Sequence, residues 1–224
     1  TVDPDEVLSK YGADTLRLFI LFAAPPEDQL EWNSDGLEGA WRFLNRVYQM
    51  VEKRYVQEPI NQAADQDLER ERNHAIKRVS QNFEEGFKFN TAISHMMVLS
   101  NAIDKHKTES SKVLNSAIET LVLLLAPFAP HLCEELWQMM GKDTKTISKV
   151  AWPAFDEKAL VQNEVNYAVQ INGKIRGQFT ASVTATQEQL RELCMKDANV
   201  MRYLEGATIK KFIVVPNKLV SIVV

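Results

Sequence analysis

Histidine and cysteine are the side chains most often used for catalysis or metal binding, and this chain holds few of them. They are His74, His95, His106, His131, Cys133 and Cys194. Their spacing matches no metal-binding pattern, and the two cysteines are too far apart for a C-x-x-C pair. No nucleophile or carboxylate partner can be named for His131, which follows a proline, so we interpret it as a residue at a helix start. We predict no catalytic residue and no metal ligand.

Paired carboxylates could supply acid–base chemistry, and carboxylates are plentiful; two of the adjacent pairs are at residues 84–85 and 134–135. Both pairs fall on predicted helices, where charged residues usually form a solvated face, and we interpret them so. The sequence also contains no nucleophile elbow, phosphate-binding loop or dinucleotide-binding motif. The protein is therefore expected to hold or read a partner rather than to transform it.

The most informative basic residues, Lys174 and Arg176, lie in the segment NYAVQINGKIRGQFTA, residues 166–181. A two-residue turn at Asn-Gly is the stronger local signal, but it would set apolar residues opposite polar ones. We therefore predict a three-residue loop, residues 172–174. The predicted pairs are Ile171 with Ile175, Val169 with Gly177 and Tyr167 with Phe179, and the predicted polar face carries Gln170, Arg176 and Gln178.

Charge is distributed unevenly along the chain. Residues 165–224 contain eight Lys and Arg against four Asp and Glu, a net charge of +4, whereas the whole chain has −4 and the remainder therefore −8. Local charge governs attraction to phosphates, so we predict that Lys174 and Arg176 contact nucleic acid at the hairpin tip. For Lys210, Lys211 and Lys218 two interpretations stay open, nucleic-acid contact and protection of an edge strand from aggregation.

A second basic set lies on a predicted long helix over residues 35–55, with Ser34 or Asp35 as its N-cap. Arg42, Arg46, Gln49 and Lys53 are spaced four, three and four apart and share one face. Like charges at this spacing repel, which a binding surface would justify, but a solvated edge paired with Glu38 and Glu52 explains them equally well. Trp41 and Tyr48, on the opposite face, are interpreted as core residues.

The spacing of apolar residues predicts the fold class. From residue 5 to about 141 the period is helical and indicates a bundle, with Pro127 and Pro130 ending one helix before residues 131–140 form another. Residues 153–164 have no sustained period and are predicted to be a linker. Two hairpins and two helices then follow in the order β-β-α-α-β-β. This order predicts a small α+β domain with helices on one sheet face and Lys and Arg on the other.

Length and composition agree with a two-domain globular protein. The chain has 224 residues, 45% of them hydrophobic, and its longest nearly apolar run, residues 121–130, is about half of a membrane span. The first residues are acidic rather than typical of a secretion signal, and cysteines are few. We expect no membrane partner and a cytoplasmic location.

Five segments of the chain resemble the class I aminoacyl-tRNA synthetases. The segment VDPDEVLSKYGADTLRLFILFAAPPEDQLEWNSDGLEGAWRFLNRVY is similar to the stretch after the K-M-S-K-S loop of that family. The segments FNTAISHMM and LLAPFAPHLCEELW are similar to its anticodon-binding bundle. VQINGKIRGQF and VPNKLVSIVV resemble the C-terminal domain of the bacterial leucyl-tRNA synthetases. The resemblance covers nearly the whole chain and is weakest over residues 56–86 and the linker.

The resemblance implies a C-terminal fragment with four parts. These are the end of a connecting fold (1–30), an anticodon-binding-like bundle (31–152), the linker (153–164) and a tRNA-binding α+β domain (165–224). It implies a tRNA-binding portion of leucine–tRNA ligase that positions tRNA(Leu) for ATP-dependent aminoacylation by an absent catalytic domain, so the fragment alone is expected to be inactive. Expected partners are tRNA(Leu) and that N-terminal catalytic domain, in a monomer. No cofactor is expected in the fragment, whereas ATP and magnesium are implied for the parent enzyme.

Two alternatives remain. The chain could be the equivalent region of a valyl, isoleucyl or methionyl synthetase, although neither a terminal coiled coil nor a cysteine-rich zinc module is evident. It could instead be a helical interaction scaffold with no RNA role. Salt dependence separates the last alternative, because binding through phosphates weakens steeply as ionic strength rises.

Overall fold

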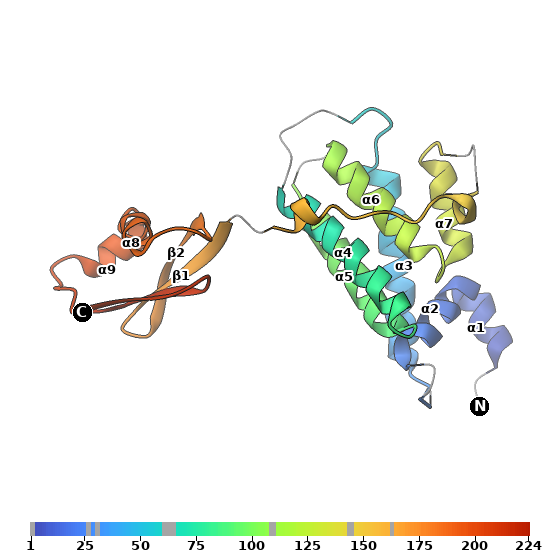
Figure 1. Ribbon diagram of the computed structural model, residues 1–224. Helices are drawn as coiled ribbons and strands as arrows, with labels where there is room; N and C mark the ends of the chain where they lie inside the picture. The colour runs from blue at the N-terminus through green and yellow to red at the C-terminus, as the bar shows by residue number, and fades with distance from the viewer. Residues whose placement is uncertain are drawn as a thin grey trace. The chain divides into compact units, whose positions relative to one another are not determined.

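The computed structural model describes residues 3–25, 28–29, 32–59, 66–107, 111–142, 146–161 and 164–224. The chain divides between Leu160 and Val161 into two compact units, and each is described by itself. The first unit is helical and the second combines a sheet with two helices (Figure 1). The predicted fold class, a helical bundle followed by a small α+β domain, is confirmed.

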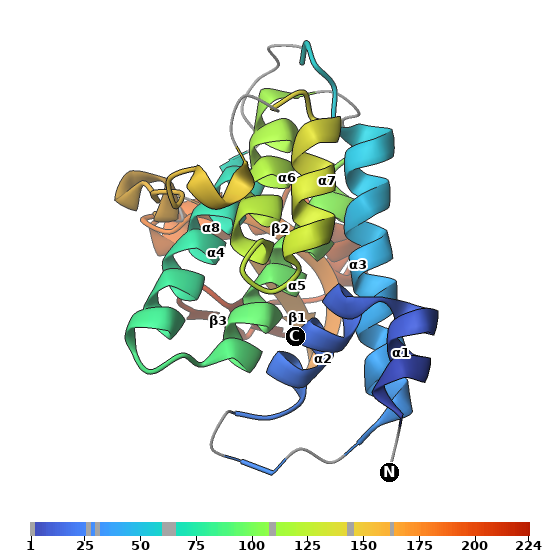
Figure 2. The same ribbon diagram turned by 90° about the vertical axis from the view of Figure 1, so that its right-hand side faces the viewer.

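Seven α-helices form the described part of the helical unit. They are α1 (Pro4–Tyr11), α2 (Ala13–Ala23), α3 (Ser34–Arg54), α4 (Gln66–Glu84), α5 (Phe89–Lys105), α6 (Lys112–Leu125) and α7 (Pro130–Met139). Two short 3₁₀ turns follow, η1 (Ile147–Lys149) and η2 (Glu157–Leu160). Helices α3, α6 and α7 run side by side, and α1 and α2 lie across one end of α3 (Figure 2).

Helix α6 occupies the centre of the bundle because it is apolar on almost every side. Nine of its residues are buried, among them Leu114, Ile118 and Leu121, and it contacts α3, α4, α5 and α7. Helix α5 buries Ile93, Met96 and Ile103, which share one face at helical spacing. The core of the bundle therefore follows the hydrophobic pattern.

Two helix starts differ from the prediction. The N-cap of α3 is Asn33, whose Oδ1 accepts hydrogen bonds from the backbone N–H groups of Asp35 and Gly36 at 3.0 and 3.2 Å, so the prediction of Ser34 or Asp35 was wrong. Helix α7 begins at Pro130, one residue before the predicted start, because proline lacks an N–H and suits the first helical position.

Trp41 does not belong to the core. Its side chain lies on α3 at the junction with α1, is 41% exposed and meets the ring of Tyr11 edge-on at 6.4 Å between ring centroids. Tyr48, one helical repeat further on, is half-buried at the edge of the core. The core interpretation of Trp41 was wrong because α1 and α2 cover only part of this face of α3.

Residues 151–160, most of which fall in the stretch predicted as a linker, lie against α4. The backbone N–H of Asp156 donates to Asn73 Oδ1 at 2.7 Å, and the indole N–H of Trp152 donates to Ser80 Oγ at 2.8 Å. Lys77 and Glu157 form an exposed ion pair at 3.2 Å. These contacts explain why the division between units falls at residue 160 rather than at 152.

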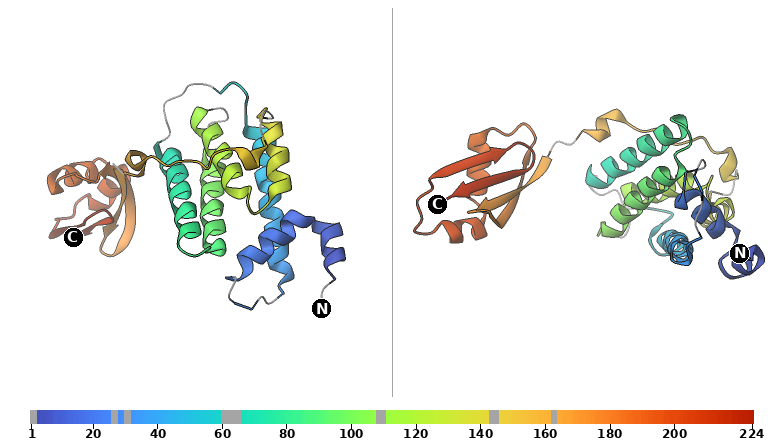
Figure 3. Two further views of the ribbon diagram at one scale, coloured as in Figure 1. Left: turned by 45° about the vertical axis from the view of Figure 1, so that its right-hand side comes forward. Right: turned by 90° about the horizontal axis from the view of Figure 1, so that it is seen from below.

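The second unit contains a four-stranded sheet with helices on one side (Figure 3). Its elements are β1 (Glu164–Ile171), β2 (Lys174–Ser182), α8 (Gln187–Cys194), α9 (Ala198–Leu204), β3 (Lys211–Val215) and β4 (Leu219–Val223). The strand order is β2-β1-β4-β3, with β1 parallel to β4 and antiparallel neighbours at both edges. Val169, Val220 and Leu190 are in the core between sheet and helices.

The β1–β2 hairpin has the two-residue turn that the sequence analysis rejected, and beyond the turn it has the strand pairing that was predicted. Tyr167 pairs with Phe179 and Val169 with Gly177 as predicted, but Ile171 pairs with Lys174 across a two-residue Asn-Gly turn, so the predicted three-residue loop was wrong. Both turn residues have positive φ, 49° and 80°, as a type I′ turn requires. A β-bulge at Arg176, the unpaired extra residue of β2, restores the apolar register.

Gly177 lies beside the bulge, where α9 approaches β2 closely. A Cβ at this position would be 2.5 Å from Val200 Cγ2 and 2.9 Å from Asp197 Oδ1. Asp197 cannot easily move because its Oδ1 caps α9 by accepting from the Val200 N–H at 2.9 Å. The absence of a side chain is therefore required for this helix to rest on the sheet.

We predict that Gly177→Ala destabilises the second unit by ~1–3 kcal/mol, the range of overpacking substitutions. Urea unfolding followed by far-UV circular dichroism measures the effect. The double variant Gly177→Ala with Val200→Ala should recover part of the loss, because the second change removes the closest clashing methyl. An unchanged unfolding midpoint for Gly177→Ala would contradict this packing.

Candidate nucleic-acid interface

Three of the predicted lysines gather at one end of the sheet. The β1–β2 turn lies beside the end of β4, because the Asn172 N–H donates to the Ile222 carbonyl at 2.9 Å and the Val224 N–H to Asn172 Oδ1 at 3.3 Å. The start of β3 reaches the same end, where the Lys210 N–H donates to the Val223 carbonyl at 2.8 Å. Lys174, Lys210 and Lys211 thus form what we call the basic end.

Lys218 lies at the opposite end of the sheet. It follows Asn217 in the β3–β4 turn, and the Asn217 N–H donates to the hydroxyl of Tyr167, near the start of β1, at 3.0 Å. The structure therefore does not bring Lys218 together with the other three lysines. A ligand that contacts all four must extend along the whole length of the strands.

Arg176 turns toward the helices rather than toward solvent. The bulge removes it from strand alternation, and its guanidinium lies over the ring of Tyr203 on α9, 4.2 Å from the centroid. Its Nη1 also donates to the Tyr203 hydroxyl at 3.1 Å. A cation–π contact of this kind holds the side chain in place while leaving its other N–H groups available.

The side of the sheet away from α8 and α9, here called the open face, differs from the expectation. It was predicted to carry Lys and Arg, but among the side chains that the structure describes Lys211 is its one charged residue. Register places there the residues Asn166, Ala168, Gln170, Ile175, Gln178, Thr180, Lys211, Ile213, Val215, Leu219, Ser221 and Val223. The error arose because the bulge places Ile175 on this face, where Arg176 was predicted.

The four lysines keep their charge available. Within residues 164–224, none of Lys174, Lys210, Lys211 and Lys218 takes part in a salt bridge, whereas Lys196 pairs with Glu192 at 2.7 Å on the helix side. That ion pair lowers the pKa of the exposed Glu192 carboxyl, first through its hydrogen bond with Lys196. The acids of α8, Glu188 and Glu192, belong to the helix layer on the side away from the open face.

The basic residues of α3 are used in different ways. Arg46 is bound to α5, because its Nη1 donates to Asn101 Oδ1 at 2.9 Å and lies 3.6 Å from Asp104 Oδ2. Arg42 makes only a long, exposed contact of 3.8 Å with Glu38. Lys53 and Gln49 are exposed. Only part of this set therefore remains free to meet a ligand.

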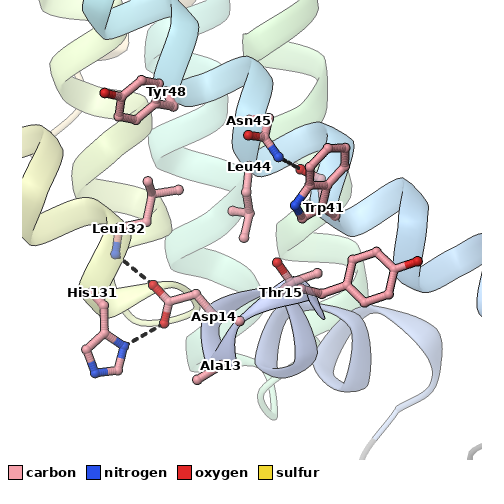
Figure 4. A pocket seen from close by; sticks show the side chains of 11 residues that line it. Ala13, Asp14, Thr15, Trp41, Leu44, Asn45, Tyr48, His131 and Leu132 are labelled. Atoms are coloured by element: carbon pink, nitrogen blue, oxygen red, sulfur yellow. Dashed lines mark hydrogen bonds and ion pairs between the residues drawn. The ribbon is translucent and has the colours of Figure 1, made fainter. Parts of the chain in front are cut away.

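A cleft of about 450 Å³ opens where α1 and α2 meet α3 and α7 (Figure 4). Trp41, Asn45 and Tyr48 line it from α3, and Asp14 and His131 from the opposite side. The Asp14 carboxylate joins two elements far apart in sequence: Oδ2 accepts from the Leu132 N–H at 2.7 Å, and Oδ1 lies 2.8 Å from His131 Nδ1. Asp14 thereby caps α7.

The other chemistry-bearing side chains of the described residues have structural surroundings. Burial raises the pKa of the Cys133 thiol strongly and that of Cys194 to about 11, so neither forms a thiolate readily. Burial and then Arg78 lower the pKa of His95. Glu134, interpreted as solvated, instead accepts from the Ile147 N–H at 2.9 Å. No group of three His, Cys, Asp or Glu able to hold a metal occurs in the described ranges.

Two residues that hold parts of these sites in place were not identified from the sequence. Asp14 caps α7, and Tyr203 holds the guanidinium of Arg176. Asp14 is an ordinary first-turn acid of a helix by pattern, and its partners lie 117 and 118 residues further on. Tyr203 lies 27 residues from Arg176. Because neither contact leaves a local sequence signal, only the tertiary structure reveals it.

A model of a known protein family matches more than half of the chain. Residues 65–191 match the family model described as the anticodon-binding domain of tRNA ligase. This match covers more than half of the chain and extends from α4 through the bundle into α8. In the described part of the chain, no helix is long and apolar enough to span a membrane.

The individual proteins to which the chain is similar are leucine–tRNA ligases. The chain is 46% identical over 230 residues to a leucine–tRNA ligase of Rippkaea orientalis and 48% identical over 240 residues to one of Synechocystis sp.. All of this chain is covered, but only 27% of each relative. A crystal structure described as the Agrobacterium radiobacter LeuRS-tRNA-LeuAMS ternary complex matches 99% of this chain and 29% of its own, with 28% identity and a TM-score of 0.68.

We predict that Asp14→Ala destabilises the helical unit by ~2–4 kcal/mol, because it leaves the Leu132 N–H uncapped and removes the partner of His131. Asp14→Asn keeps one acceptor oxygen and should cost less. His131→Ala, which spares the cap, serves as the matched control and should cost under ~1 kcal/mol because the imidazole is exposed. Chemical unfolding compares the three, and equal losses for Asp14→Ala and His131→Ala would contradict the capping role.

Proposed function

The chain belongs to the family of tRNA ligases that carry this anticodon-binding domain, and we propose that it is the tRNA-binding portion of a leucine–tRNA ligase. In this role it positions tRNA(Leu) for aminoacylation by another part of a longer protein. The similarity to leucine–tRNA ligases over the full length of both units supports the choice of amino acid. The solved relative is described as a complex with tRNA, which supports the choice of ligand.

The basic end carries this proposal. Three lysines without salt-bridge partners among residues 164–224 meet where a turn and a strand start converge, and residues 165–224 carry a net charge of +4. Phosphates attract such a cluster through long-range electrostatics, and flexible ammonium groups adapt to an irregular backbone. Lys218 extends the contact to the other end of the sheet, and Arg176 contributes from its position over Tyr203.

The helical unit offers a second, weaker contact region. Arg42 and Lys53 lie exposed on α3 and can reach phosphates of the same tRNA, whereas Arg46 supports α3 through its bonds to α5. Two separate contact regions on one tRNA increase the effective concentration of each for its target. Affinity of the whole chain should therefore exceed that of either unit.

Catalysis belongs to the parent protein in this proposal. The chain spans about 27% of the length of the relatives that it matches. ATP and magnesium would act in the parent's catalytic domain, which is the other proposed partner, and no cofactor is assigned to the present chain. We further propose a monomer that works in the cytoplasm.

Binding of tRNA by the 224-residue chain tests the proposal directly. A filter-binding titration with leucine tRNA should show an affinity that falls linearly on a double-logarithmic plot against salt concentration. A tRNA of different overall shape, which keeps the same charge density, serves as the control for specificity. Absence of salt-dependent binding would reject the proposed function.

We predict that Lys174→Ala with Lys211→Ala weakens tRNA binding and lowers the slope of log affinity against log salt by ~1.5, since each lost phosphate contact contributes about 0.7–0.9. Arg176→Ala in the Lys174→Ala background should weaken binding further. Lys196→Ala with Arg202→Ala removes the same charge from the helix side and should leave the slope nearly unchanged. If the Lys174→Ala, Lys211→Ala variant and the Lys196→Ala, Arg202→Ala variant had equal salt slopes, the assignment of the basic end would be contradicted.

A further inference from the structure

Aromatic rings form a connected row in the helical unit, near the point where α4 ends and α5 begins. The ring centroid of Phe83 lies 5.9 Å from that of Phe89, 5.8 Å from that of Phe128 and 5.7 Å from that of Trp152. Phe87 continues the row, 5.8 Å from Phe89. Phe128 is buried, whereas Trp152 is 42% exposed and Phe87 59%. The row therefore extends from the core to the surface, where a group of exposed aromatic side chains indicates a contact surface.

A hollow of about 400 Å³ has two of these rings as walls. Its described lining residues are Ser80, Phe83, Glu84, Pro127 and Trp152. The rings of Phe83 and Trp152 meet at 87°, so we call this hollow the aromatic corner. The indole N–H of Trp152 donates to Ser80 Oγ at 2.8 Å, and Phe83 is held by its neighbours in the row. The walls are thus already in place for a ligand.

The charge of the aromatic corner fits a cation. Glu84 is exposed and has no salt-bridge partner among the described residues, whereas the neighbouring Glu85 pairs with Lys88 at 3.2 Å. Aromatic faces are electron-rich, and Glu84 is the last residue of α4, where the helix dipole is negative. None of the described lining residues is basic, and residues 1–164 carry a net charge of −8. A phosphate would be repelled from this hollow.

A guanidinium suits these groups better than an ammonium does. It is planar and weakly hydrated, so it stacks on aromatic faces, and its parallel N–H groups bind both oxygens of a carboxylate. A compact, strongly hydrated ammonium gains less from leaving water. The chain makes the same kind of contact within its second unit, where the guanidinium of Arg176 lies 4.2 Å from the ring centroid of Tyr203.

Phe87 adds backbone strain to this surface. Its φ is 55°, in the left-handed region that a bulky side chain rarely adopts. Glycine would take this conformation without strain. Because the ring is mostly exposed, burial within the chain contributes little to offset the strain. Strained residues are typical of functional sites, and a contact outside the chain accounts for an exposed aromatic side chain at this position.

We propose that the aromatic corner binds an arginine side chain of a partner protein. The guanidinium stacks on the aromatic walls and pairs with Glu84, and Phe87 contacts an apolar residue near that arginine. The proposal does not depend on the proposed function, because it uses residues of the helical unit to which tRNA binding assigns no role. It adds a protein partner, recognised through an arginine next to apolar residues.

NMR of the 224-residue chain, labelled with ¹⁵N, tests the proposal with the peptide acetyl-Leu-Arg-Leu-amide as the probe. The indole N–H resonance of Trp152 should shift and saturate as peptide is added. Trp137 is buried and does not line the hollow, so its indole resonance should stay in place. The same peptide with citrulline in place of arginine keeps the shape without the charge and should bind about fivefold more weakly or worse.

Charge-matched variants supply the second test. Glu84→Gln should raise the Kd of the arginine peptide about fivefold or more. Glu135→Gln makes the same charge change at an exposed position of α7 outside the hollow and should leave the Kd nearly unchanged.

Phe87→Gly separates binding from folding. It should unfold at nearly the same urea concentration as the unmodified chain, because relief of strain offsets the added freedom of the unfolded chain. It should nevertheless bind the arginine peptide more weakly, since the apolar contact is lost. Impaired folding could not explain such a loss.

Three outcomes would overturn the proposal. The first is equal binding of the arginine and citrulline peptides, or no shift of the Trp152 resonance at millimolar peptide. The second is a dimer of the chain alone in sedimentation that Glu84→Gln dissociates, which would assign the corner to a second copy. The third is binding by this chain but not by the longer parent protein, which would show that another segment of the parent fills the corner.

Discussion

One extra backbone residue in β2 decides the arrangement of the second unit. Val169 and Gly177 must face the helices, while the Asn-Gly turn, with two positive φ angles, closes most easily as a two-residue loop. The two requirements call for pairings of β1 with β2 that are offset by one residue. A shift of one residue would move every side chain of the strand to the other face of the sheet. The bulge at Arg176 satisfies both, and its consequences reach the helix packing, the open face and the placement of charge.

The bulge also separates two kinds of surface. It directs Arg176 to Tyr203 on the helix side and places Ile175 on the open face. Positive charge is therefore held at the ends of the sheet, and the middle remains uncharged except at Lys211 in the described residues. An anionic ligand that covers this face would be attracted at the ends of the sheet, while the uncharged middle imposes no desolvation of charge.

Much of the fold could be predicted from the sequence because hydrophobic period is a local signal. The bundle and the β-β-α-α-β-β order follow from the pattern. The side of the sheet on which each basic residue lies could not be predicted. A bulge such as the one at Arg176 interrupts the alternation of the strand, and the sequence gives no periodic signal of its position. The exposure of Trp41 and the cap formed by Asp14 depend on how α1 and α2 meet α3 and α7, which no local pattern encodes.

Arginine and lysine are used differently in this chain. Among the described residues, several arginines act as internal donors: Arg54 donates to the carbonyls of Ile103 and His106, and Arg17 to that of Pro127. A planar guanidinium with five N–H groups can bridge carbonyls at helix ends, whereas a compact, strongly hydrated ammonium gains less from leaving water. The charge left available in the second unit is consequently carried mainly by lysine. Attraction that depends on lysine is adaptable and sensitive to salt, so by itself it discriminates little between one anionic ligand and another.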